Sequence, residues 1–93
     1  MMPLKTTGES GHHDFKADTV VFFMLNGADR VRCVVTLQAL EKFDPKMGRY
    51  EAACLACFNQ HRSEIENAAS AKFDKGHAER DGTIMVMEGD LKP

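Results

Sequence analysis

Two cysteines and a histidine stand at helical spacing in the second half of the chain. Cys54, Cys57 and His61 follow an i, i+3, i+7 pattern, which places all three on one face of a helix. Thiolate and imidazole are ligands that zinc prefers, and Cys33 becomes a fourth candidate if the helix packs on its strand. The Cys-x-x-Cys pair also suggests thiol chemistry, although a redox site places that motif directly after a strand. Apolar neighbours such as Phe58 favour core packing, and a metal- or thiol-dependent site remains the alternative.

The other chemistry-bearing residues form no recognisable catalytic motif. His12-His13-Asp14 offers weak metal ligands, but its polar surroundings favour ordinary solvated side chains. Gly82-Thr83 lacks the pattern of a phosphate-binding loop, and no serine stands in a nucleophile elbow. The carboxylates are scattered rather than paired for acid–base work. We therefore expect no catalytic residue, no metal and no cofactor.

Four residues are candidates for contact with a partner: Arg32, Val34, His61 and Arg62. Arg32 and Val34 share one face of a predicted strand, and arginine is favoured at interfaces because its planar fork makes paired hydrogen bonds. Arg62 has a competing role, because Glu66 stands four residues further along the same helix. An ion pair within the chain is the interpretation that we favour for Arg62.

The charge balance argues against an electrostatic nucleic-acid binder. The 93 residues carry 12 Lys and Arg against 14 Asp and Glu, a formal net charge of -2. Proteins that bind nucleic acid through phosphate contacts usually carry a basic excess. A nucleic-acid-associated regulator that uses Arg30, Arg32 and Arg62 is therefore the weakest of the three hypotheses.

The periodicity of the apolar residues predicts the elements that position these side chains. Strands are expected at 19–25, 30–35 and 83–87, and helices at 37–43 and 50–75. Asn26-Gly27 predicts a tight turn, because both turn positions favour positive φ. Thr36 is expected to cap the short helix. At ~1.5 Å per residue the long helix would measure ~39 Å and overhang a small sheet.

Together these elements predict an α+β domain with the order β-β-α-α-β. Residues 1–17 are expected to form a mobile N-terminal arm with Phe15 as its apolar anchor, and residues 18–93 a single domain. If the long helix reverses the chain once, the third strand runs parallel to the second and pairs antiparallel beside the first. The result is a three-stranded antiparallel sheet of order 2-1-3, with one long helix packed on one face.

The chain resembles a known family at the level of these spacings. The residues that carry the likeness are Val20-x-Phe22, the strand end Arg32-Cys33-Val34-Val35-Thr36, Leu40, then Phe58-x-x-His61-Arg62-x-x-Ile65-Glu66-x-Ala68-Ala69, and Gly82-Thr83-Ile84. They resemble the small bacterial family catalogued as domain of unknown function 1488, over roughly 15–91. The resemblance implies a small α+β domain with no assigned activity and no catalytic residues to carry over.

A contact function fits the predicted architecture better than chemistry in a pocket. One helix layer leaves the second sheet face partly apolar, and such a face is normally covered. We expect a non-catalytic interaction or regulatory module that self-associates as a homodimer or binds another protein. The longest apolar run is six residues, 20–25, whereas a membrane helix needs ~20. The N-terminus has no apolar signal-peptide core, so we expect a cytoplasmic location.

Overall fold

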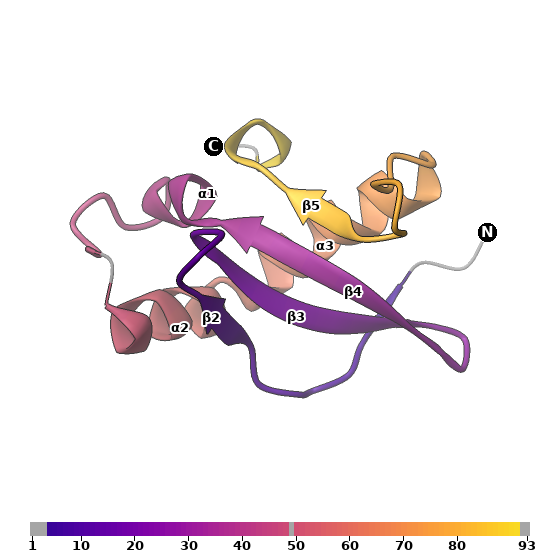
Figure 1. Cartoon of the computed structure of the whole chain (residues 1–93), viewed down its shortest axis with the longest axis horizontal. Coiled ribbons are helices and arrows are strands. Elements are labelled where there is room, and N and C mark those ends of the chain that lie inside the picture. The colour runs from indigo at the N-terminus through magenta and orange to yellow at the C-terminus, as the bar shows by residue number, and fades with distance from the viewer. Residues whose placement is uncertain (1–3, 49, 92–93) are drawn as a thin grey trace.

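The computed structural model describes residues 4–48 and 50–91. Within these residues it shows one mixed sheet backed by helices (Figure 1). The strands are β1 Lys5–Thr6, β2 His12–Asp14, β3 Thr19–Asn26, β4 Asp29–Thr36 and β5 Ile84–Val86. The helices are α1 Leu37–Glu41, α2 Glu51–Gln60, α3 Arg62–Asp74 and the short 3₁₀-helix η1 Glu88–Asp90. The α+β class is therefore confirmed.

The β3–β4 hairpin forms the centre of the sheet. Its register runs from Thr19 opposite Thr36 to Asn26 opposite Asp29. The two turn residues are thus Gly27 and Ala28, one position later than the sequence predicts. Gly27 has a φ of 64°. Glycine at the first turn position is typical of a type II′ turn, whose twist matches that of the strands.

The sheet order differs from the predicted order 2-1-3, and the sheet is mixed rather than antiparallel. β5 pairs with β4 and not with β3, in the order β1-β3-β4-β5. The predicted edge of β3 is occupied by β1 and β2, so the third predicted strand pairs with the only remaining side of the hairpin. β5 does run parallel to β4, as one reversal of the chain requires.

Part of the segment 1–17, for which the sequence predicts a mobile arm, pairs with the sheet in the structure, and residues 1–3 of that segment lie outside the described residues. β1 and β2 both pair antiparallel with β3, and residues 7–11 form the loop that connects them. The anchor is Leu4, which is buried and whose backbone N–H donates to Ser70 Oγ at 3.0 Å. Phe15, the expected anchor, is 65% exposed.

The single long helix expected over 50–75 is two helices. His61 joins them with φ -110° and ψ 17°, outside helical values. The ring of His61 stacks on Phe43 with 4.1 Å between centroids and 10° between planes. The break lets α2 contact β2, β3 and α1 while α3 contacts β5. The two helices therefore cover different strands of the sheet.

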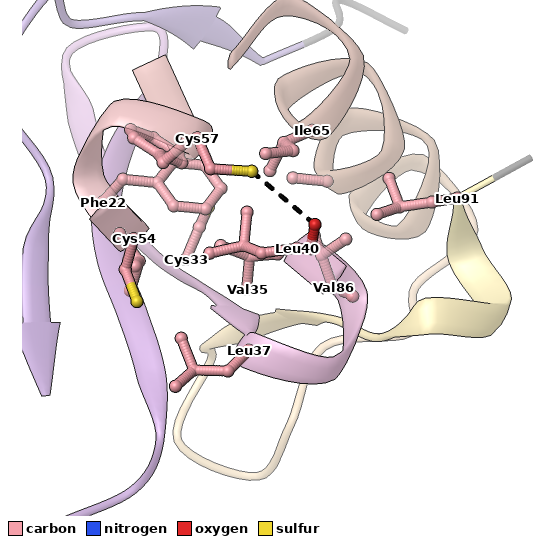
Figure 2. Packing of buried hydrophobic residues seen from close by; sticks show 14 of the residues in the cluster. Phe22, Cys33, Val35, Leu37, Leu40, Cys54, Cys57, Ile65, Val86 and Leu91 are labelled. Atoms are coloured by element: carbon pink, nitrogen blue, oxygen red, sulfur yellow. Dashed lines mark hydrogen bonds between the residues drawn. The ribbon is translucent and has the colours of Figure 1, made fainter. Parts of the chain in front are cut away.

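The core lies between the sheet and its helices. One face of the hairpin contributes Val20, Phe22, Met24, Cys33 and Val35, all buried. Phe22 meets Phe58 of α2 with ring centroids 5.0 Å apart. Figure 2 shows Phe22, Cys33 and Val35 converging with Leu37 and Leu40 of α1 and Ile65 of α3. The helix-covered face is therefore the one that carries Val20, and the face that carries Val21 is open. We call the latter the open face.

A polar network protects the free edge of β5. Lys72 Nζ donates to Met85 O at 2.7 Å and to Asp90 Oδ2 at 3.0 Å, and Asp90 Oδ2 also accepts from Met87 N at 2.8 Å. Lysine at a strand edge blocks the pairing of another strand there. Burial opposes the charged form of Asp90, but the Met87 amide and the Lys72 ammonium outweigh it, so the pKa of this carboxyl lies below its usual value.

The lowered pKa of Asp90 predicts a dependence of stability on acid. Because the unfolded chain takes up this proton more readily, the stabilisation is present above the unfolded pKa and disappears as the pH falls through the folded pKa. Asp90→Asn is expected to lower the free energy of unfolding at neutral pH and to flatten its decline towards acid. Urea titrations from neutral to acidic pH measure both effects. Asp29→Asn at the exposed hairpin end is the control, and an equal flattening there would contradict the assignment.

Candidate functional site

The three cysteines are core residues in the structure. Cys33, Cys54 and Cys57 are all buried. The Cys57 thiol donates to Leu40 O at 3.6 Å (Figure 2). Burial, then the charge of Glu66, raises the pKa of Cys33 to about 12, and burial followed by the charge of Asp44 raises the pKa of Cys57. Neither of these two thiols is poised to form the thiolate that metal binding or thiol chemistry needs.

The structure gives the metal alternative no support. Across residues 4–48 and 50–91, no group of three or more His, Cys, Asp or Glu side chains is placed to hold a metal ion. His61 stacks on Phe43 and its Nδ1 lies 3.7 Å from Glu64 Oε1. The helical spacing that suggested three ligands instead places two thiols in the core and the imidazole at the helix break.

The ion pair that we favoured for Arg62 is confirmed. Arg62 Nε lies 3.0 Å from Glu66 Oε2, and both side chains are largely buried. The guanidinium carbon also lies 5.2 Å from the centroid of the Phe58 ring. Arg62 and His61 therefore lie on the helix side, away from Arg32 and Val34. The four predicted interaction residues do not form one surface.

Arg32 and Val34 line a groove of about 570 Å³ on the open face. We call it the open-face groove, and its lining residues are Ala17, Thr19, Arg32, Val34, residues 79–81, Thr83 and Met85. β4 and β5 supply the floor, because Val34 and Met85 are partners in the β4–β5 register, and β3 contributes Thr19. Thr19, Val34 and Thr83 are each at most 5% exposed, so they belong to the packed part of the fold.

A hydrogen-bonded turn forms one wall of the groove. Glu79 N donates to Thr83 O at 2.8 Å, and Gly82 N donates to Glu79 O at 2.9 Å. Asp81 Oδ1 accepts from Thr83 N at 2.9 Å. This bond, more than the nearby charge of Arg32, holds the pKa of Asp81 below its usual value. Gly82 has a φ of 86°, which only glycine adopts readily.

The arginines of the open-face groove differ from the other described arginines in their ion pairs. Arg30 pairs with Glu9 at 2.7 Å and covers the Phe23 ring, and Arg62 pairs with Glu66. Arg32 donates to the Thr83 hydroxyl at 3.2 Å. Among the four arginines that the structure describes, only Arg32 and Arg80 have no carboxylate within ion-pair distance, and both line the groove.

Of the residues that line this groove, only Arg32 and Val34 were predicted from the sequence, and the others were missed. Arg32 and Val34 were expected to lie on an open sheet face, but Arg80, Thr19 and Met85 were not connected to them. The Asp81-Gly82 turn signal places Arg80 in the loop that leads into the last strand. Only the pairing of that strand with β4 brings Arg80 beside Arg32.

Comparisons with known proteins agree on the family. The sequence profile of the family described as a protein of unknown function (DUF1488) matches residues 8–86. A crystal structure of a protein of unknown function from the same family, from Shewanella loihica PV-4, is similar in fold with a TM-score of 0.83. The two chains are 19% identical over 92% of this chain and 93% of the other. No curated protein matches the chain.

No helix in the described part of the chain is both long and apolar enough to cross a membrane.

The fold, the spacing of the motifs and the profile match over 8–86 all indicate the same family. The chain belongs to the DUF1488 family of proteins of unknown function.

Proposed function

We propose that this protein is a non-catalytic interaction module whose open-face groove binds a second copy of the same chain. The observation that carries the proposal is the pair of arginines without a carboxylate partner, Arg32 and Arg80, beside the acidic residues Glu79 and Asp81. A surface with neighbouring charges of both signs is complementary to itself across a two-fold axis. In such a dimer Arg80 of one copy faces Glu79 of the other.

The edges of the sheet favour contact through the face rather than strand addition. Lys72 occupies the outward carbonyl of Met85 at the β5 edge. At the other edge β1 and β2 are two and three residues long and are separated by the loop of residues 7–11. Short, interrupted or lysine-capped edges resist pairing with another chain. A second copy is therefore expected to lie against the open face, where Val21 and Met85 are half-buried.

We place the module in the bacterial cytoplasm. Its cysteines are buried thiols, as in proteins of reducing compartments. The structurally similar family member comes from a bacterium. Fractionation of cells that produce the native chain tests this location, and recovery from the periplasm or the membrane would contradict it.

Charge-reversal variants are expected to control self-association in a pairwise manner. Glu79→Arg alone and Arg80→Glu alone place like charges across the interface and should each weaken it by about tenfold or more. A mixture of the two variants restores both attractive pairs, so a heterodimer should form where neither variant dimerises alone. Sedimentation velocity from micromolar to millimolar protein measures each case.

Two neighbouring positions on the exposed face of α2 provide the matched control. Asn59→Arg and Gln60→Glu introduce charges of the same signs on the helix side. These variants should associate as the native chain does. A native chain that stays monomeric at millimolar concentration, or a mixture that stays monomeric, would overturn the proposal.

A further inference from the structure

The open-face groove has the chemistry of a small-ligand site as well as that of a contact surface. We infer that it binds a small organic carboxylate, whose charge lies between Arg32 and Arg80 and whose apolar body lies on Val34 and Met85. This inference goes beyond self-association and can hold without it. A separate consequence, competition between the carboxylate and a second copy, rests on the proposed function.

The guanidinium of Arg32 has the donors that a carboxylate needs. Of its five N–H groups, the structure assigns one hydrogen bond, from Nη1 to the Thr83 hydroxyl. That bond fixes the orientation of the side chain beside the groove without using its planar fork. Asp81, a carboxylate of the same groove, instead accepts a hydrogen bond from the Thr83 amide. Bidentate binding of a carboxylate by guanidinium is among the strongest polar contacts in proteins.

A buried hydroxyl in the groove lining also lacks a partner. Thr19 is 5% exposed, and its Oγ1 makes no hydrogen bond to any residue that the structure describes. A buried hydroxyl without a partner costs free energy, and such groups in native structures often mark a position for a ligand or water. Thr19 lines the groove from β3, Arg32 from β4, and Thr83 from the residue that directly precedes β5. The polar groups therefore converge from different strands on one volume.

The size and the floor of the groove set the class of ligand. Its volume of about 570 Å³ falls in the range of ligand sites, ~300–1,000 Å³. Val34 and Met85 lie side by side in the β4–β5 register and give an apolar floor. Inorganic phosphate would leave this floor uncovered and would meet Glu79 and Asp81 on the rim with a larger negative charge. A monoanion with an apolar body fits better.

Benzoate, benzyl alcohol and benzylamine make a matched set of probes, because they share a ring and differ in charge. The experiment is an amide chemical-shift titration of the full chain, at a protein concentration below detectable association. Benzoate is expected to shift the amides of Thr19, Arg32, Thr83 and Met85 saturably, with millimolar affinity. Benzyl alcohol and benzylamine are expected to shift them weakly and without saturation.

Single substitutions assign the contacts. Arg32→Met is expected to weaken benzoate binding about tenfold, and Arg32→Lys by less, because the charge stays while the fork is lost. Arg80→Met, on the exposed turn, is a second variant with no core contact to lose. Thr19→Val keeps the shape and should weaken binding severalfold. Arg30→Met, on the same face but outside the groove, should leave the affinity unchanged.

Three results would overturn the inference: equal binding of all three probes, stronger binding of inorganic phosphate than of benzoate, or equal losses for Arg30→Met and Arg32→Met. The proposed ligand site and the proposed self-association can each be contradicted without the other. Saturable benzoate binding by a chain that stays monomeric supports the ligand site and contradicts self-association. A chain that dimerises but shows no saturable benzoate binding supports self-association and contradicts the ligand site. If both hold, benzoate is expected to lower the dimer fraction in sedimentation.

Discussion

Phe58→Ala is expected to lower the free energy of unfolding by about 3–5 kcal/mol, the usual range for deleting a buried phenyl ring. Phe58 is fully buried and its ring joins α2 to Phe22 of β3. A chain of 93 residues has a total stability of only about 5–14 kcal/mol. The melting temperature should therefore fall by roughly 15–30 °C. Thermal unfolding followed by circular dichroism measures the shift.

Phe58→Leu is the matched control, because it keeps most of the volume and should cost about 1.5 kcal/mol or less. A double-mutant cycle with Phe22→Leu isolates the ring–ring contact, which is expected to contribute about 0.5–1.5 kcal/mol. A loss below 1 kcal/mol for Phe58→Ala would show that α2 does not depend on this contact.

Gly11→Ala is expected to destabilise the fold by about 1–3 kcal/mol, although the same change usually stabilises a loop. Gly11 is buried and directly precedes β2. A Cβ atom there would lie 3.0 Å from Val20 Cγ1 and 3.1 Å from Phe58 Cε2. Both neighbours are fully buried, so a shift of either side chain disturbs the packing around it. Hydrogen exchange at the β2 and β3 amides should accelerate with the loss of stability.

Gly89→Ala is the control for this prediction. A Cβ atom at Gly89 would meet nothing within 4 Å. The unfolded chain loses entropy in both variants, so Gly89→Ala should be neutral or slightly stabilising. If Gly11→Ala is equally neutral, the N-terminal segment does not pack against Val20 and Phe58 as described.

The parts of the fold that the sequence predicts well depend on neighbours within a few residues. The strands around Val20 and Val31 follow from β-branched residues and alternation. The Thr36 cap is present, with its hydroxyl 3.1 Å from Ala39 N. The Arg62–Glu66 pair follows from helical spacing alone. Each of these features needs only local geometry, so a single sequence can specify it.

The helix break at His61 depends on contacts with residues that are distant in the sequence. The residues around it favour a continuous amphipathic helix, and the pattern contains no proline or glycine there. The break instead accompanies the stacking of His61 on Phe43, eighteen positions earlier, and the divergence of α2 and α3 over different strands. Those contacts exist only after the sheet has assembled.

The sequence by itself determined the α+β class of the fold, the two strands of the hairpin and the face that Val31, Cys33 and Val35 share. The tertiary structure decided which face of the first strand is buried, because the helices cover the side that carries Val20, Phe22 and Met24. It also decided the partner of the last strand, because residues 5–6 and 12–14 occupy the other edge of β3. That choice brings the turn at 79–82 to Arg32 and forms the groove with Thr19. Strand pairing joins residues far apart in the chain, and short-range patterns do not specify which edge will be open.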